Sequence, residues 1–97
     1  MLRLIFHPEA DAELIAAAQY YESQFTGLGA DFLKETTNAL DSIHKFPQAW
    51  PVREAEIRQR PLKRFPYAVL YRVTPDHIRI LAIAHLHREP GYWRLRF

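Results

Sequence analysis

Apolar residues alternate with polar ones at the start of the chain and then recur at helical spacing. Leu2, Leu4 and Phe6 share one side of a strand predicted over residues 2–6. A helix is predicted from about Pro8 to Gln24, because proline fits a first helical turn and acidic residues follow it. The apolar stripe predicted for this helix comprises residues three or four positions apart: Leu14, Ala18, Tyr21 and Phe25.

A second helix is predicted from about Ala30 to Lys45, after a glycine-containing turn at residues 27–29 and before Pro47. The short connection makes the two helices an antiparallel hairpin. The apolar face predicted for the second helix is Phe32, Thr36, Ala39 and Ile43, widened by Leu33 and Leu40.

The rest of the chain alternates at period two and predicts three strands, Ile57 to Phe65, Tyr67 to Val73 and Ile78 to His87. Pro61 lacks a ladder donor, so the first of them is an edge strand or is bulged there. The face predicted for the last strand consists of Ile78, Ile80, Ala82, Ala84 and Leu86. One α+β domain over residues 1–97 follows, in which an N-terminal strand and an antiparallel helical hairpin pack on a mainly antiparallel four-stranded sheet.

Charge is distributed unevenly along the chain. Residues 1–50 hold three basic and seven acidic side chains, whereas residues 51–97 hold ten basic, nine of them arginine, and four acidic. Guanidinium groups suit phosphate and carboxylate, so the C-terminal half points to an acidic partner, either nucleic acid or an acidic peptide. The acidic residues of the first helix, Glu13 among them, are interpreted as complementing its dipole and as a solvated face.

Cysteine is absent, which excludes disulfides, thiolate zinc sites and a cysteine nucleophile. Glycine-rich phosphate loops, a nucleophile elbow and paired catalytic carboxylates are also absent, and no cofactor is expected. The apolar run before His7-Pro8 is too short for a signal peptide or a membrane span, so we expect a cytoplasmic protein without membrane contact.

Several short segments, in their order and spacing, resemble the RelE/ParE toxin superfamily over essentially the whole chain. They are residues 8–14, Tyr20-Tyr21-Glu22, Gly27-Leu28-Gly29, Phe32-Leu33, Phe46-Pro47, Ile57-Arg58, Arg64-Phe65-Pro66-Tyr67, Leu70-Tyr71-Arg72-Val73 and residues 85–93. The resemblance implies a growth-inhibiting toxin that is co-expressed with a cognate antitoxin, whose flexible segment wraps a groove of the toxin. Operator DNA would be bound only through the antitoxin.

Two targets occur in this superfamily: RelE-like members cut mRNA on the ribosome, and ParE-like members poison DNA gyrase without being nucleases. The long first helix with Tyr-Tyr-Glu and the Gly-Leu-Gly turn look more ParE-like. Nuclease members often carry an arginine directly after the tyrosine of the third-strand motif, and Ala68 stands there. Gyrase is therefore the favoured target and the ribosome with its mRNA the alternative. A remnant that only pairs with an antitoxin is a third possibility.

Two constellations could carry binding or chemistry. The first is the basic run Arg58, Arg60, Lys63 and Arg64, either a clamp for phosphate or antitoxin carboxylates or a charged edge strand protected from pairing. The second comprises His85, His87, Arg88, Tyr92 and Trp93.

For RNA cleavage, Arg64, His87, Arg88 and Tyr92 would supply the base, the acid and the phosphate clamp. The simpler interpretation is that Tyr92 and Trp93 pack the C-terminal segment onto the sheet while the histidines cap a strand. His85 and His87 also have metal-ligand spacing, but no third ligand is evident, and no metal is predicted.

Overall fold

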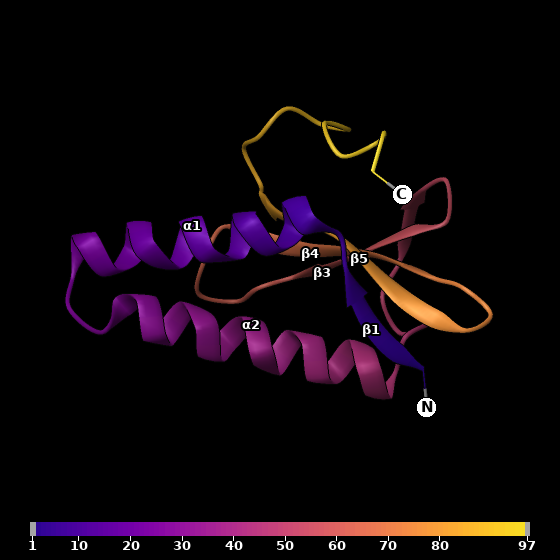
Figure 1. The fold of residues 1–97 in the computed structure, drawn as a ribbon, viewed down its shortest axis with the longest axis horizontal. Coiled ribbons are helices and arrows are strands. Elements are labelled where there is room, and N and C mark those ends of the chain that lie inside the picture. Colours follow the sequence, from indigo (N-terminus) through magenta and orange to yellow (C-terminus); the bar gives the residue numbers. More distant parts are fainter. Residues whose placement is uncertain (1, 97) are drawn as a thin grey trace.

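A computed structural model describes residues 2–96 as two layers, a helical hairpin and a five-stranded sheet (Figure 1). The elements follow in the order β1 (Arg3–Phe6), α1 (Pro8–Gln24), α2 (Leu28–Lys45), β2 (Val52–Glu54), β3 (Ile57–Pro61), β4 (Tyr67–Val73) and β5 (His77–His85). The spatial strand order is β1-β5-β4-β3-β2. Only β1 and β5 pair in parallel, so the predicted mainly antiparallel α+β fold is confirmed.

The structure has one strand more than the sequence predicted. Residues 52–54 form β2 on the edge beside β3, in a stretch predicted to be a connector. β3 ends at Pro61 and not at Phe65. β2 reaches only the first two residues of β3, so Pro61 lies where β3 has no outer neighbour and its missing N–H costs no ladder bond.

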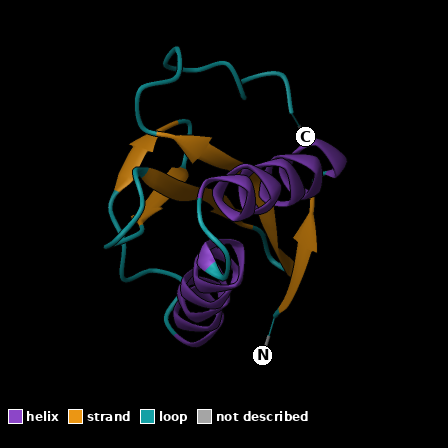
Figure 2. Cartoon of the chain, turned by 90° about the vertical axis from the view of Figure 1, so that its left-hand side faces the viewer, coloured by secondary structure: helices purple, strands orange, loops and turns teal. Residues whose placement is uncertain are grey.

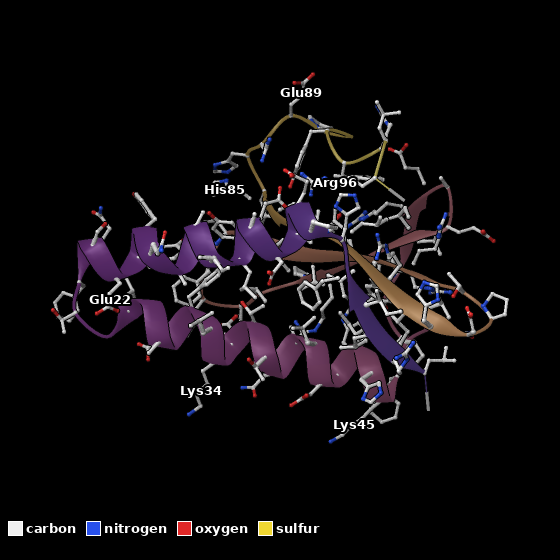
Figure 3. The ribbon with its side chains drawn as sticks, in the orientation of Figure 1. Glu22, Lys34, Lys45, His85, Glu89 and Arg96 are labelled. Atoms are coloured by element: carbon white, nitrogen blue, oxygen red, sulfur yellow. The ribbon has the colours of Figure 1, made fainter. Side chains whose placement is uncertain are left out.

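The turn between α1 and α2 requires one glutamate and two glycines, for reasons that the contacts there make clear. The Glu22 carboxylate accepts hydrogen bonds from the N–H groups of Gly27 and Gly29, so it caps the positive N-terminal end of α2 (Figure 3). Gly27 has φ +91°, and a Cβ on Gly29 would lie 2.6 Å from the Ala18 carbonyl oxygen of α1. The two helices can approach this closely only because residue 29 has no side chain.

The helical face of the sheet carries the larger core. Phe32, Thr36, Ala39 and Ile43 of α2 are all buried, as the helical spacing predicts. From α1, Leu14, Ala18 and Tyr21 pack against this core, but Phe25 is 73% exposed because it follows the last helical residue. Phe32 lies within 5.3 Å of the rings of three aromatic residues, measured between centroids: Tyr21, Phe65 and Tyr67.

The face predicted for β5 is only half correct. A register shift opposite Leu70 and Tyr71 leaves Leu81 as an extra residue, so the alternation of sides reverses there. Ile78, Ile80 and Ile83 therefore belong to the helical core. The face opposite the helices, called the outer face below, has its own core of Ile57, Leu70, Leu81, Ala82, Ala84 and Trp93, with Tyr92 packed against it.

β5 also ends two residues earlier than predicted, at His85. Residues 86–96, called the C-terminal tail below, then run as a series of turns beside the sheet and away from α2 (Figure 2). Trp93 is 9% exposed, which confirms that the tail packs on the sheet. Within residues 2–96 no helix is both long and apolar enough to cross a membrane.

Candidate functional site

Glu13 of α1 is the centre of a hydrogen-bonded network that holds the C-terminal tail. Its side chain is only 14% exposed. Oε2 accepts hydrogen bonds from the Tyr92 hydroxyl at 2.7 Å and from Arg88 Nη1 at 3.3 Å. Arg96 donates to both carboxylate oxygens, at 2.8 and 3.1 Å. The interpretation of Glu13 as a solvated residue is therefore wrong, because its carboxylate is the anchor of the tail.

The position of this network follows from the unequal lengths of β1 and β5. β1 pairs with β5 only as far as Ile80, so the next residues of β5 have no strand on that side. Glu13 Oε1 accepts a hydrogen bond from the Ile83 N–H at 3.1 Å, and Arg96 Nη1 donates to the Leu81 carbonyl at 3.0 Å. The ion pair thus satisfies backbone groups that a longer β1 would have paired.

Electrostatics and ring stacking tighten the network. Burial raises the pKa of Tyr92 well above its usual range, and the Glu13 carboxylate adds to the shift. The hydrogen bond to Glu13 likewise raises the pKa of Arg96. The guanidinium carbons of Arg88 and Arg96 lie 3.8 and 4.9 Å from the centre of the Tyr92 ring. The tail is therefore held by charge, hydrogen bonding and cation–π contact together.

A hollow of about 320 Å³ lies between the outer face and the tail. Apolar side chains line much of it: Ala68, Leu70, Ala84, Pro90 and Trp93. Charged residues that also line the hollow are Arg53, Glu54, Arg88 and Glu89. Ala68 is 1% exposed, so the position where nuclease members often carry arginine is occupied by a buried methyl group.

The four candidate nuclease residues are distributed over two places. Arg88 and Tyr92 are in contact through ring stacking and through Glu13. Arg64 instead belongs to the loop after β3, where it lies 3.5 Å from Asp31 of α2 and over the Phe65 ring. His87 is exposed on the tail. Direct contacts therefore join Arg88 to Tyr92, whereas Arg64 has other partners.

The basic run around β3 has mostly internal partners. Arg58 donates to the carbonyl oxygens of Gln48 and Trp50, at 3.2 and 2.6 Å. Arg60 donates to the Ser42 hydroxyl at 3.2 Å and lies over the Trp50 ring. These two arginines fix the connector between α2 and β2.

The loop after β3 is fixed to α2 by its backbone. The N–H groups of Lys63 and Arg64 donate to the Glu35 carboxylate. Their own side chains remain exposed, and that of Arg64 is 62% exposed. Within the basic run, Lys63 and Arg64 are therefore the residues with charge available at the surface.

The two histidines close the end of β5. His85 Nδ1 accepts a hydrogen bond from the His87 N–H at 3.1 Å, and the Arg88 N–H donates to the His85 carbonyl oxygen at 3.0 Å. His85 stacks edge-on against Tyr67, and the two imidazole centroids lie 5.3 Å apart. The strand-capping interpretation therefore holds for His85, whereas His87 takes part through its backbone N–H and its side chain is exposed. Among residues 2–96 no three potential metal ligands are grouped.

A groove of about 210 Å³ separates α1 from the end of β5. Ala16 and Ala17 form its helical side, and Tyr67, Ile83 and His85 form its sheet side, with Glu13 and Arg88 at one end. Tyr20, one turn further along the same face of α1, is 58% exposed. An apolar surface bordered by a cation is thus available beside the unpaired part of β5.

Sequence reasoning missed Glu13 and Arg96 as residues of the site. Arg96 lay in the arginine-rich half, but nothing in its spacing marks it as the partner of Glu13. The one local signal at Glu13 is its place next to Leu14, at the border of the apolar stripe of α1.

The chain is thus an α+β protein in which a helical hairpin covers one face of a five-stranded sheet and an arginine-containing tail packs on the other. The family model described as "ParE toxin of type II toxin-antitoxin system, parDE" matches residues 4–90. This chain belongs to the ParE toxin family.

Solved structures agree on the fold. A chain from "Chromosomal ParDE TA system from P. aeruginosa" matches with a TM-score of 0.67 and 24% identity, over 90% of this chain and 98% of that one. A search of curated proteins finds no match.

Proposed function

We propose that this protein arrests bacterial growth in the cytoplasm by binding and poisoning DNA gyrase, and that a cognate antitoxin neutralises it. Membership of the ParE family supports the toxin assignment. The choice of gyrase over RNA rests on the buried Ala68 in an apolar-lined hollow. During RNA cleavage the scissile phosphate gains negative charge, which cationic groups directed at it must stabilise. The methyl group of Ala68 supplies no such charge.

An mRNA endoribonuclease is the second candidate, because Arg88 and Tyr92 stand side by side. Both donate to Glu13, however, and the Tyr92 hydroxyl has thereby used its one donor hydrogen. A tyrosine whose pKa is raised is also a weak general acid, and its anion is scarce near neutral pH. These contacts favour a structural role for the pair.

The gyrase proposal is tested by supercoiling of relaxed plasmid with purified gyrase and the purified toxin. We expect inhibition that rises with toxin concentration and is reversed by the cognate antitoxin. Heat-unfolded toxin serves as the control for non-specific effects of protein. Full supercoiling at saturating, folded toxin would refute gyrase as the target.

The nuclease candidate is tested by primer extension on an mRNA under translation, with the toxin added to the reaction. We expect no toxin-dependent ends. Cuts that appear with wild-type toxin and disappear in Tyr92→Phe would replace the gyrase proposal with the RNA one. Normal growth of cells that express folded toxin without antitoxin would favour the third possibility, a remnant.

For the antitoxin, we propose docking along the α1–β5 groove and the neighbouring surface cations. The exposed cations and imidazoles of the predicted set are Lys63, Arg64, His87 and Arg88, with His85 half-buried in the groove. An acidic, partly apolar segment would match both the cations and the exposed Tyr20. Arg58 and Arg60 contribute indirectly, by fixing the connector. Operator DNA would be bound through the antitoxin.

This docking surface is tested by charge reversal. Lys63→Glu combined with Arg64→Glu should weaken antitoxin binding about tenfold or more at low salt and less at high salt, because exposed charges are screened. Lys34→Glu, an exposed substitution on α2, is the matched control. Equal affinities of the double variant and the control at low salt would place the antitoxin elsewhere.

A further inference from the structure

A second hollow, of about 270 Å³, lies on the outer face between the β2–β3 turn and the tail. Buried apolar side chains from three segments line it: Ile57, Leu81 and Trp93. Three arginines also line it, Arg72, Arg94 and Arg96, with Glu54 as the acidic residue. An apolar surface with convergent cations is the pattern of a site for a small ligand with an anionic group.

Two of these arginines are neutralised by fixed carboxylates. Arg94 makes a two-pronged pair with Glu54, at 2.8 and 2.9 Å. Arg96 is paired with Glu13. Both guanidinium planes are therefore held in one orientation, while their net charge is largely balanced.

Arg72 differs from both. Its side chain is half-buried, and within residues 2–96 it has no hydrogen bond and no carboxylate partner. Directly opposite it in the β4–β5 register stands Arg79, whose Nη1 donates to the Phe6 carbonyl oxygen at 3.4 Å. Like charges that face each other across two strands destabilise a sheet. An anion bound at Arg72 would remove this repulsion.

The rim of the hollow also contains a strained turn. Ala55 and Glu56 join β2 to β3 with φ of +49° and +64°, a conformation that hairpins normally give to asparagine or glycine. A residue with a side chain destabilises the fold by about 1–2 kcal/mol when its backbone adopts this left-handed conformation. Ala55 lines the hollow, and the turn holds Glu54 against Arg94. Such strain is concentrated at functional sites more often than elsewhere.

We infer that this hollow binds a small phosphate monoester, with the phosphate at Arg72 and the non-polar remainder against Ile57, Leu81 and Trp93. Arginine is the side chain best suited to a planar, two-pronged contact with phosphate oxygens. The volume of about 270 Å³ lies just below the usual range of small-molecule sites, which limits the ligand to at most about the size of a mononucleotide. The site is independent of the antitoxin and of gyrase.

Calorimetric titration of the whole protein with AMP, inorganic phosphate and adenosine, at constant ionic strength, tests the inference. We expect AMP and phosphate to bind, AMP more tightly, and adenosine to bind far more weakly than AMP. Arg72→Gln should weaken AMP binding about tenfold or more, as expected for a lost charge-assisted contact. Arg64→Gln, which removes the same charge on the helical side of the sheet, should bind AMP like wild type.

Thermal unfolding of Arg72→Gln separates a binding role from a structural one. Without ligand, the variant should melt at or above the wild-type temperature, since the repulsion with Arg79 is relieved. AMP should raise the melting temperature of wild type and of Arg64→Gln, and leave that of Arg72→Gln nearly unchanged. The inference fails if wild type binds no phosphate, if phosphate binds but AMP does not, or if Arg72→Gln binds AMP as wild type does.

Discussion

The helical hairpin covers one face of the sheet with buried apolar and aromatic side chains, whereas a tail without helix or strand covers the other face. On the helical side, Phe32 and Ile43 are fully buried in a large core. On the outer side, Trp93 supplies the apolar contact and Glu13 the main ionic one. Packing on the first face is shared among many residues, so no single polar group controls it. Ionic attachment on the second face depends on two carboxylates: Glu13, whose side chain is only 14% exposed, and Glu54, which is more exposed and pairs with Arg94.

Of the substitutions considered, Phe32→Ala should destabilise the protein most, because it removes part of the core on the helical side of the sheet. The side chain is fully buried among three aromatic rings, so its loss should lower the free energy of unfolding by about 3–5 kcal/mol. Denaturant unfolding measures the change. Phe32→Leu, which retains most of the volume, should cost about 1.5 kcal/mol or less. Similar, small losses in both variants would show that the hairpin is loosely packed.

Glu13→Gln should weaken the attachment of the C-terminal tail on the outer side of the sheet. The amide can still accept from Ile83 N–H, but it leaves Arg96, whose side chain is 12% exposed, without its counter-charge. We expect a loss of about 2–4 kcal/mol, near the lower end because water reaches part of the network. Asp41→Asn, at an exposed position on α2, should change stability by about 0.5 kcal/mol or less. Equal effects in both variants would show that Glu13 does not anchor the tail.

Tyr92→Phe should remove part of the same network and reveal its dependence on pH. Loss of the hydroxyl that donates to Glu13 should cost about 1–2 kcal/mol at neutral pH. The pKa of Tyr92 is raised in the folded state, so the contribution of its hydroxyl is complete below the unfolded value of about 10. Above that pH the unfolded chain loses the proton first, and the contribution declines. Unfolding from pH 7 to 11 should therefore show the two proteins converging, and a constant difference would contradict the assignment.

Glu56→Gly should stabilise the protein slightly, because it relieves backbone strain in the β2–β3 turn on the outer side. Glycine adopts the φ of +64° without penalty, so we expect a gain of about 0.5–1 kcal/mol, reduced by the greater freedom of the unfolded chain. Gly27→Ala is the reciprocal test on the helical side, where φ is +91° and alanine should destabilise by about 1 kcal/mol. Thermal melts of both variants provide the measurement. A destabilised Glu56→Gly would mean that the glutamate makes a contact that outweighs its strain.

The helical side was largely predictable from the sequence, because helical spacing and end signals are local. Residues 8–24 form the first helix as predicted, and the four residues predicted for the face of α2 are all buried. The errors lie at boundaries: Phe25 follows the helix end, and α2 begins at Leu28 because Glu22 caps it.

The outer side was less predictable because its determinants are not local. The bulge at Leu81 reverses the sides of β5, and it arises from pairing with β4 and not from residue type. Glu13 and its partners are more than 70 positions apart in sequence, as the separation of 75 between Glu13 and Arg88 illustrates. The dense basic run near β3 was predicted as a possible binding site, yet Arg58 and Arg60 have internal partners. Arg72, which lines the second hollow, does not belong to that run.

Amide hydrogen exchange of wild type and Glu13→Gln tests most directly the central claim, that the largely buried Glu13 carboxylate is the main anchor of the tail. The amides of Arg94 and Arg96 donate to carbonyl groups within the tail, at 3.0 and 2.9 Å, and should be protected in wild type. In Glu13→Gln we expect their protection to fall much further than that of the α2 amides. Fast exchange of the tail in wild type, or an equal loss of protection in the tail and in α2 of the variant, would contradict the account.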